Sequence, residues 1–427
     1  HPENQLPEDS TTAKPSISTA SISRADFLHV WNYGRQRLTQ IEQEIQMNCD
    51  ITGRRAILGG LTTLGGMQTW QSHCQGQAAA PDHAPIDVGF VTEPTASHRR
   101  SYLRILGKCD GVRRIAVVDP TGKTVEESKR LLGSRFAYAG KDTKQVLANL
   151  RPALTVITLE AHHTPAAIEE ALRLHSHVLT EKPACVDRAQ LNRIATLADN
   201  HRRQLMLAMS TRSSPLIQRA RTLIQENFLG KPYAATMDWV ADQTRLKNPD
   251  YQASWLSFKN LAGGGKLIFH GIHYLDIITF LVNQPIRHIS AMCANVGGQP
   301  IEVEDAAIVN FQTDKGLLGT LNTGYYLERG KQNQIRIWGA HGWLELQMLP
   351  ERRMLWSSSH PDAPRGVQEV TCPATPSLYE LFFQAAIAFT RGLGDPPITT
   401  AESAHALDVV FCGYQAAENG QTQTLAS

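Results

Sequence analysis

The strongest constraint on the fold is an alternation of short apolar segments with amphipathic segments between residues 86 and 209. The apolar segments are rich in β-branched residues and carry few polar side chains. Strands of this kind are buried on both faces, as in a parallel sheet that helices cover on each side. The alternation therefore predicts an α/β fold with a doubly wound parallel sheet. The expected strands are Ile86–Val91, Ile115–Asp119, Leu154–Thr158, Val178–Leu179 and Gln204–Met209.

Helix signals lie between these strands. Pro165 suits a first helical turn, because that position needs no amide donor. Thr143 and Asp187 are candidate N-caps, and further helices are expected near Ser101–Leu106 and Thr124–Leu132.

Beyond residue 210 the pattern changes to longer strand candidates with few helices between them. Turn sequences such as Asp314-Lys315-Gly316 and Ala340-His341-Gly342 predict hairpins. The expected strands are Tyr233–Val240, Ile286–Val296, Ala306–Thr313, Gly316–Tyr325, Asn333–Trp338 and Gly342–Gln347. The expected helices are Pro215–Asn227, Tyr274–Val282, Leu378–Leu393 and Ala401–Asn419. We expect an N-terminal extension (1–82), a parallel α/β domain (83–208) and a C-terminal α/β domain with a large, mostly antiparallel open sheet (209–427).

The charge balance and the cysteine pattern argue against several classes of protein. Lys and Arg number 42 and Asp and Glu number 40, for a net charge of +2, which disfavours a nucleic-acid-binding surface. The seven cysteines are scattered, with neither a disulfide framework nor a Cys-x-x-Cys pair. No apolar run reaches the length of about 18 residues expected of a membrane-spanning helix.

The extension contains a twin arginine, Arg54-Arg55, followed by a mildly apolar, Gly-rich run and by Ala78-Ala79-Ala80. This order is similar to a twin-arginine export signal with a cleavage site. An amphipathic extension fits the same residues, so a periplasmic and a cytoplasmic location both stay open.

Glu181-Lys182-Pro183 follows the expected strand Val178–Leu179. It therefore lies at the carboxyl end of a parallel strand, where open α/β sheets bind ligands. Pro183 favours an extended backbone at Lys182. The pKa of a lysine changes readily on burial, which suits Lys182 to polarise a hydroxyl or to move a proton.

The turn after the first strand stands where a dinucleotide's diphosphate usually binds, but it has none of the three usual glycines. The hydroxyls of Thr92, Thr95 and Ser97, with Arg99 or Arg100, are candidate replacements for glycine amides. The alternative is a turn that binds no dinucleotide.

Two further residues are candidate cofactor contacts. Asp119 ends the second strand, where an acid accepts hydrogen bonds from a ribose and repels a 2′-phosphate, which favours NAD over NADP. It equally suits the start of a turn before Pro120. His163 follows the third expected strand, on the same sheet edge as Lys182; a helix N-terminal histidine bonded to backbone is the alternative.

Gly263-Gly264-Gly265 precedes a segment with two histidines, His270 and His273, and the acid Asp276. On a helix, His273 and Asp276 are i,i+3 neighbours. A carboxylate beside an imidazole orients it and raises its basicity, as an acid/base pair requires. A structural His–Asp pair and a metal site are the alternatives; no further ligand is obvious, so we expect no metal.

Taken in order, these motifs resemble those of the glucose–fructose oxidoreductase, inositol dehydrogenase and MocA (Gfo/Idh/MocA) family. The likeness covers roughly residues 85–425. It rests on His163-Thr164-Pro165, Glu181-Lys182-Pro183, Met209-Ser210-Thr211-Arg212, Leu229-Gly230-Lys231-Pro232 and Gly271-Ile272-His273-Tyr274-Leu275-Asp276. The resemblance implies a Rossmann domain that binds NAD(P), oxidation or reduction of sugars, cyclitols or related polyols, and an open sheet that often packs against a second subunit.

The resemblance also implies roles for single residues. Lys182 resembles the catalytic lysine, with Glu181 beside the cofactor, and His273 resembles the histidine that exchanges the hydroxyl proton. Asp276 resembles the acid one turn further along, and Arg212 resembles a residue at the entrance to the substrate domain. Phe269 stands where active members often carry Asp, and His270 is a candidate substrate contact that partly compensates.

The leading hypothesis is an NAD-linked oxidoreductase that acts on a small sugar or polyol, as a homo-oligomer formed through its C-terminal sheet. Two alternatives stay open. One is a carbohydrate-binding or regulatory protein with a vestigial cofactor site, and the other is NAD-assisted hydrolysis or elimination of a glycoside.

Overall fold

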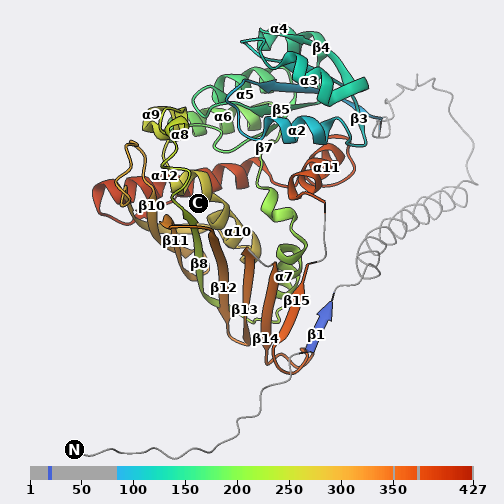
Figure 1. Ribbon diagram of the computed structural model, residues 1–427. Helices are drawn as coiled ribbons and strands as arrows, with labels where there is room; N and C mark the ends of the chain where they lie inside the picture. The colour runs from blue at the N-terminus through green and yellow to red at the C-terminus, as the bar shows by residue number, and fades with distance from the viewer. Residues whose placement is uncertain (1–17, 22–83, 350–351, 373–375, 426–427) are drawn as a thin grey trace, which may run out of the picture. The chain divides into compact units, whose positions relative to one another are not determined.

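The computed structural model describes residues 18–21, 84–349, 352–372 and 376–425 (Figure 1). The twin arginine and the small residues after it lie outside the described residues.

The first half of the described chain is a six-stranded parallel sheet in the order β4-β3-β2-β5-β6-β7. Its strands are β2 (Ile86–Thr92), β3 (Val112–Val118), β4 (Phe136–Gly140), β5 (Leu154–Thr158), β6 (His177–Thr180) and β7 (Leu205–Leu207). All five residues of β5 are buried, as expected for a strand covered on both faces. The predicted doubly wound parallel sheet is confirmed. The sequence analysis missed β4, an edge strand without a buried residue.

Helices alternate with these strands. They are α2 (Arg99–Leu106), α3 (Val125–Leu132), α4 (Thr143–Leu150), α5 (Thr164–Arg173) and α6 (Arg188–Asn200), with a short 3-10 turn, η1 (Gly133–Arg135), before β4. Asp187 caps α6 as predicted, by accepting from the Gln190 amide. The predicted cap of α4 is wrong by one residue, because the carboxylate of Asp142 accepts from the Gln145 amide and Thr143 is already helical.

The second half, with the short N-terminal strand β1, forms a ten-stranded sheet in the order β1-β15-β14-β13-β12-β8-β11-β10-β9-β16. The strands are β1 (Ser18–Ser21), β8 (Pro232–Asp242), β9 (Ile286–Ala294), β10 (Ala306–Thr313), β11 (Leu318–Leu327), β12 (Lys331–Gly339), β13 (Gly342–Leu349), β14 (Arg353–Ser358), β15 (Gln368–Thr371) and β16 (Gln423–Thr424). β11 pairs with β8 in parallel, whereas β9–β10, β10–β11, β8–β12, β12–β13, β13–β14 and β14–β15 are antiparallel. The predicted mostly antiparallel sheet is confirmed.

Helical segments of this half lie against the large sheet and beside the parallel one (Figure 1). They are η2 (Ser210–Ser213), α7 (Pro215–Gln225), α8 (Pro249–Gln252), η3 (Trp255–Ser257), α9 (Lys259–Ala262), η4 (Leu267–Gly271), α10 (Ile272–Val282), α11 (Leu378–Thr390) and α12 (Thr400–Asn419). η4 is a π-helical turn that leads directly into α10.

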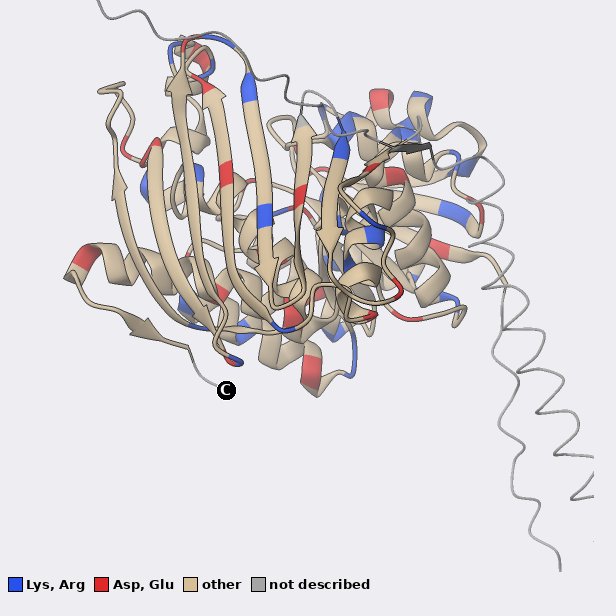
Figure 2. Ribbon diagram, turned by 90° about the horizontal axis from the view of Figure 1, so that it is seen from below, with Lys and Arg blue, Asp and Glu red and all other residues tan. Residues whose placement is uncertain are grey.

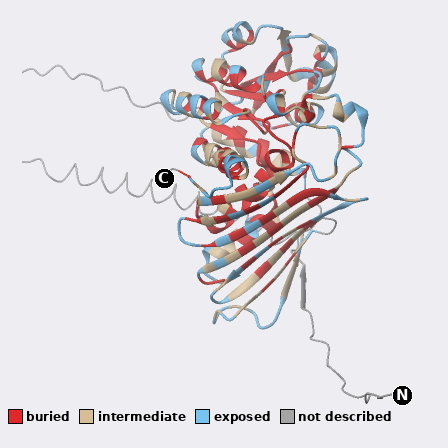
Figure 3. Cartoon of the chain, turned by 90° about the vertical axis from the view of Figure 1, so that its left-hand side faces the viewer, coloured by how far each residue is buried: buried red, intermediate tan, exposed pale blue. Residues whose placement is uncertain are grey.

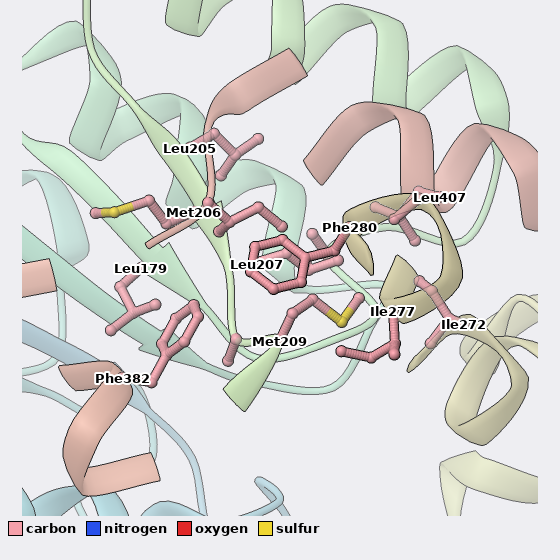
Figure 4. Close-up of a cluster of buried hydrophobic side chains, with 14 of the residues drawn as sticks. Leu179, Leu205, Met206, Leu207, Met209, Ile272, Ile277, Phe280, Phe382 and Leu407 are labelled. Atoms are coloured by element: carbon pink, nitrogen blue, oxygen red, sulfur yellow. The ribbon is translucent and has the colours of Figure 1, made fainter. Parts of the chain in front are cut away.

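One continuous hydrophobic core joins the two halves. Figure 4 shows the junction, where Leu205 and Leu207 of β7 lie close to Phe280 of α10 and Leu407 of α12. Because protein cores are packed as densely as organic crystals, this junction fixes α10 relative to the carboxyl edge of the parallel sheet.

The stretch Lys259–Val282 is apolar and long enough to cross a membrane by composition, but 83% of its most apolar window is buried inside the fold. A buried core helix can meet the same criteria of length and composition.

Figure 3 shows buried positions in bands across the large sheet, next to bands that are only partly covered.

Candidate active site

Lys182 lies where the parallel sheet meets the C-terminal half. Its Nζ donates to the carbonyl oxygen of Phe269 in η4 at 2.6 Å and lies 5.3 Å from the centre of the Phe269 ring. Burial and the nearby charge of Arg245 lower the pKa of Lys182, although Glu181 opposes that shift. Position 269, where the resemblance leads one to expect an acid, therefore offers Lys182 only the neutral backbone carbonyl of Phe269.

The triple glycine allows η4 to approach this point. A Cβ on Gly265 would lie 2.0 Å from the carbonyl oxygen of Glu304, and one on Gly264 would lie 2.1 Å from the hydroxyl of Tyr414. Glycine is the residue that permits such close passage. The Glu304 carboxylate then accepts from the amides of Gly265 and Leu267, which fixes the start of η4.

His270 and His273 follow on η4 and α10, and the Nδ1 atom of each is buried without a hydrogen-bond partner in the described structure. Burial, with the charge of Lys182, lowers the pKa of His273 to about 3. Burial and the charges of Lys266 and Lys182 hold the pKa of His270 well below its usual value. Both imidazoles are thus neutral near pH 7 and able to accept a proton or a hydrogen bond.

The structure does not form the expected pair between His273 and Asp276. Both carboxylate oxygens of Asp276 accept from the Arg212 guanidinium, at 2.6 and 2.9 Å, and Arg212 also binds Glu402 at 2.7 Å. Despite burial, these two acids hold the pKa of Arg212 above its ordinary value. The prediction failed because the spacing of His273 and Asp276 in the sequence does not show that Arg212, on η2, lies beside Asp276 in the fold. In this geometry Asp276 and Arg212 tie η2 to α10.

Glu181 is buried beside Lys182. Its Oε2 accepts from the Tyr102 hydroxyl and lies 3.4 Å from His98 Nδ1, whereas its Oε1 is buried without a partner. Burial alone would raise the pKa of Glu181, but His98, Lys182 and Tyr102 together hold it below its usual value.

The glycine-free turn after β2 is joined to the loop after β5. Glu93 accepts from the Glu160 amide at 2.6 Å and lies 3.0 Å from His163 Nδ1, and the Thr95 hydroxyl donates to Glu160 at 2.6 Å. The Ser97 carbonyl accepts from Thr158 at 2.5 Å. The His163 imidazole therefore contacts a carboxylate side chain, while the His163 amide donates to the Glu160 carbonyl oxygen. Glu93 and Glu160 are carboxylates that the sequence analysis did not single out. Glu160, His162 and His163 also each place a potential metal ligand atom within 4.8 Å of the others.

Asp119 is fully buried at the end of β3. Its carboxylate accepts from the Thr121 amide and hydroxyl, at 2.9 and 2.8 Å, and from the Thr124 amide at 2.7 Å. These bonds shape the turn before α3, as the alternative role of Asp119 at the start of a turn predicts. A role of Asp119 toward a ribose stays a prediction.

The residues at this edge fit a bound dinucleotide. A hollow of about 320 Å³ lies at the N-terminus of α2 and is lined by Pro94, Ala96, His98, Arg99, Arg100 and Ser101. Thr92 Oγ1 and Arg99 Nε are buried without partners in the described structure, as is Oε1 of Glu181, whose other oxygen lies 3.4 Å from His98 Nδ1. Helix N-termini favour anions. Arg99 and Arg100 bind Glu127 at 2.7 and 2.8 Å, and a role of either toward a diphosphate stays a prediction.

Two cavities flank His270. One, of about 200 Å³, is lined by residues that include His273, Trp239, Thr211 and Asn333. The other, of about 370 Å³, is lined by Trp239, Ala241, Asp242, Thr244, Arg245, Asn248, His270, Tyr325 and Lys331. Trp239 borders both, and the sequence analysis did not single it out. A further missed residue, Lys266, is a charge inside the apolar run after the triple glycine, which was the available signal.

Two family models match the chain. The model described as an oxidoreductase family with an NAD-binding Rossmann fold matches residues 86–209, and the model of the GFO/IDH/MocA C-terminal domain matches residues 217–345. They cover both sides of the junction that holds Lys182 and His273.

The individual relatives described next are at most 29% identical to this chain. D-xylose 1-dehydrogenase [NADP(+)] of Haloarcula marismortui is 29% identical over 156 residues, which are 36% of this chain and 42% of that protein. The match thus spans less than half of that dehydrogenase. 2,7-anhydro-N-acetylneuraminate hydratase of Mediterraneibacter gnavus is 22% identical over 265 residues, 58% of this chain and 67% of that protein. A solved levoglucosan dehydrogenase, in complex with NADH and levoglucosan, shares the fold with a TM-score of 0.70 at 14% identity, covering 80% of this chain and all of that one.

Proposed function

Because the chain belongs to the Gfo/Idh/MocA family of oxidoreductases with an NAD-binding Rossmann fold, we propose that it oxidises or reduces a carbinol carbon of a sugar, cyclitol or related polyol. This proposal depends on one observation: the Lys182 ammonium donates a hydrogen bond to η4, and η4 and α10 carry two neutral histidines, His270 and His273. A bound nicotinamide supplies the hydride acceptor or donor, with NAD preferred over NADP.

Lys182 polarises the reacting hydroxyl. Its hydrogen bond to the Phe269 carbonyl holds Nζ at the junction, and no acid side chain at position 269 neutralises it. A lysine with a lowered pKa is a stronger hydrogen-bond donor to a developing alkoxide than an ordinary lysine, so it stabilises the charge that forms during oxidation.

His273 accepts the hydroxyl proton during oxidation and returns it during reduction. The imidazole is neutral in the free protein because burial disfavours its cation. A developing negative charge on the substrate favours the imidazolium and so raises the proton affinity of His273 at the moment of transfer. His270 lies one turn earlier and contributes a substrate contact.

The test is Lys182→Met, which removes the ammonium and keeps a side chain of similar length. We expect the kcat of a confirmed sugar substrate to fall by about 10²–10⁴-fold, while Lys123→Met, at an exposed turn, leaves it unchanged. Mass spectrometry of the denatured protein checks for nicotinamide that co-purifies. Unaltered turnover in Lys182→Met would remove Lys182 from the mechanism.

Two alternatives have specific support. The carboxylate of Glu93 in the turn after β2, and that of Glu160 in the adjoining loop after β5, favour a carbohydrate-binding protein with a vestigial cofactor site. Titration with NAD(H) and NADP(H) decides, since micromolar affinity excludes this alternative. The relative named as a hydratase favours NAD-assisted hydrolysis or elimination, which predicts sugar conversion without net NADH.

We also propose that two subunits pack through the large sheet. Figure 2 shows few charged residues along its strands. Met292 and Ile308 are cross-strand neighbours that are 78% and 50% exposed. Leu318 and Trp338, 58% and 39% exposed, flank the half-buried Ala234 on neighbouring strands. Light scattering of Ile308→Asp is expected to show monomers where the wild type shows dimers or higher oligomers.

A further inference from the structure

We propose that the 370 Å³ cavity beside His270 binds a negatively charged group of the sugar, a carboxylate or a phosphate, and that Lys266 is the buried residue that sets this specificity. This inference rests on the proposed function, because it names the substrate class of the same site.

Lys266 is an unusual charge. Its side chain is 1% exposed, and its Nζ is buried without a hydrogen-bond partner in the described structure. Nζ lies 4.2 Å from the ring centre of Tyr325 and 4.8 Å from that of Trp239. Both rings line the cavity, so the ammonium stands directly behind two of its walls.

Among the described residues, no acid forms a hydrogen bond with Lys266 Nζ. The nearest acid along the fold, Glu304, uses one oxygen for the Leu267 amide and the Tyr414 hydroxyl and the other for the Gly265 amide. Asp242 lines the cavity, but its carboxylate accepts from the amides of Thr244 and Gly330. A buried, unpaired ammonium is costly, and a ligand anion is the missing counter-charge.

Besides Asp242, the other charged groups around the cavity are cations. Arg245 and Lys331 line it, and neither forms an ion pair within 4 Å among the described residues. Arg245, Lys331 and Lys182 all act on Lys266 as like charges. The exposed pair can contact an anion directly, whereas Lys266 acts through its charge in a region of low dielectric, where such forces are strong.

The cavity also has the character of a ligand site. Its volume falls in the range of about 300–1,000 Å³ that is usual for small-molecule sites. Trp239 and Tyr325 offer aromatic faces, and His270, shared with the proposed reaction centre, places the anion next to the reacting part of the same substrate.

The direct test compares three sugars with one ring: D-glucose, D-glucuronate and D-glucose 6-phosphate. We expect calorimetry of the full chain at pH 7 to show at least one anion bound about tenfold more tightly than D-glucose, a difference of about 1.4 kcal/mol. Lys266→Met should reduce this preference to about threefold or less, and the matched exposed variant Lys315→Met should keep it. Arg245→Gln, at an exposed position, serves the same purpose should Lys266→Met not fold.

Proton uptake provides a second readout. Burial and the neighbouring cations lower the pKa of Lys266 to about 7, so at pH 8 most of it is neutral. A bound anion raises that pKa, and the complex takes up protons, which makes the binding enthalpy differ between Tris and HEPES buffers. Lys182 also has a lowered pKa, so the diagnostic quantity is the proton uptake that disappears in Lys266→Met. Burial keeps both histidines neutral at this pH, because it lowers their pKa values.

The outcomes separate the two proposals. Equal affinity for all three sugars, no binding of either anion, or an unchanged preference in Lys266→Met each overturns the anion site. The better of the two anions identifies the group. Anion binding without any NADH-linked turnover would sink the proposed oxidoreductase and leave the anion site standing, and turnover of D-glucose without an anion preference would do the reverse.

Discussion

Replacing Asp276 by Asn distinguishes a structural acid from a catalytic one. The side chain keeps its shape and loses its charge, while Arg212 keeps its position between η2 and α10. If Asp276 serves mainly to hold Arg212, as the two short hydrogen bonds indicate, the variant should lose stability and keep its chemistry.

The expected loss follows from the burial of the pair. Arg212 and Asp276 are 4% and 2% exposed at their side chains, and breaking such a pair typically costs about 3–5 kcal/mol. Glu402 still binds Arg212, and the Asn oxygen can accept one hydrogen bond, so we expect the lower end, about 3 kcal/mol in the free energy of unfolding. Glu402→Gln is the matched control: its side chain is 42% exposed, and such pairs contribute about 1 kcal/mol or less.

Urea unfolding followed by tryptophan fluorescence measures both variants, and initial rates below the transition measure kcat. We expect Asp276→Asn to shift the midpoint and to change kcat by less than about fivefold, since acid/base groups typically contribute about 10²–10⁴-fold. The double variant Arg212→Met with Asp276→Leu should recover most of the stability, because well-packed apolar side chains can replace a buried ion pair. A shift below about 1 kcal/mol together with a hundredfold fall in kcat would refute this reasoning and return Asp276 to the reaction.

Further predictions concern pH and the cofactor turn. The pKa of His273 is lowered to about 3 and that of His177 to about 4, both by burial. The unfolded chain therefore binds more protons than the folded one below about pH 6.5, so stability is complete above that pH and falls by up to about 1.4 kcal/mol per pH unit per group as pH drops toward 4. Urea midpoints between pH 4.5 and 7.5 test this, and His273→Gln should flatten the slope by about one proton. Glu93→Gln removes a carboxylate from the phosphate turn and should tighten NADH binding by about threefold to tenfold, through weaker repulsion of the diphosphate; NADH fluorescence titration measures it, and weaker binding would show that Glu93 holds the turn in its binding form.

Much of the fold follows from periodicity, because both sheets have strong local signals. The buried β-branched strands β2 and β5 and the capped helix α6 could be read directly from the sequence. The strands β4, β14 and β15 could not, since they carry mixed sequences that only sheet pairing makes extended. In the proposed site, order along the chain singled out Lys182, His270 and His273, and the structure brings Lys182 to the segment that carries both histidines; their catalytic roles stay predictions. Order along the chain could not reveal that Arg212 forms an ion pair with Asp276, because that contact joins residues 64 positions apart.

Two residues at the start of the η4–α10 segment, Phe269 and Lys266, act on the charge of the site in the same direction. Where the resemblance leads one to expect an acid, Phe269 offers only its carbonyl to Lys182. Three residues earlier, Lys266 adds a buried ammonium behind Trp239 and Tyr325. An acid at 269 would pair with Lys182 and neutralise part of this charge; its absence leaves both ammonium groups without a carboxylate from η4. Buried cations lower each other's pKa, and the shared way to relieve them is an anion from outside the protein. The same feature that weakens the expectation for a neutral polyol therefore strengthens the case for an acidic or phosphorylated sugar.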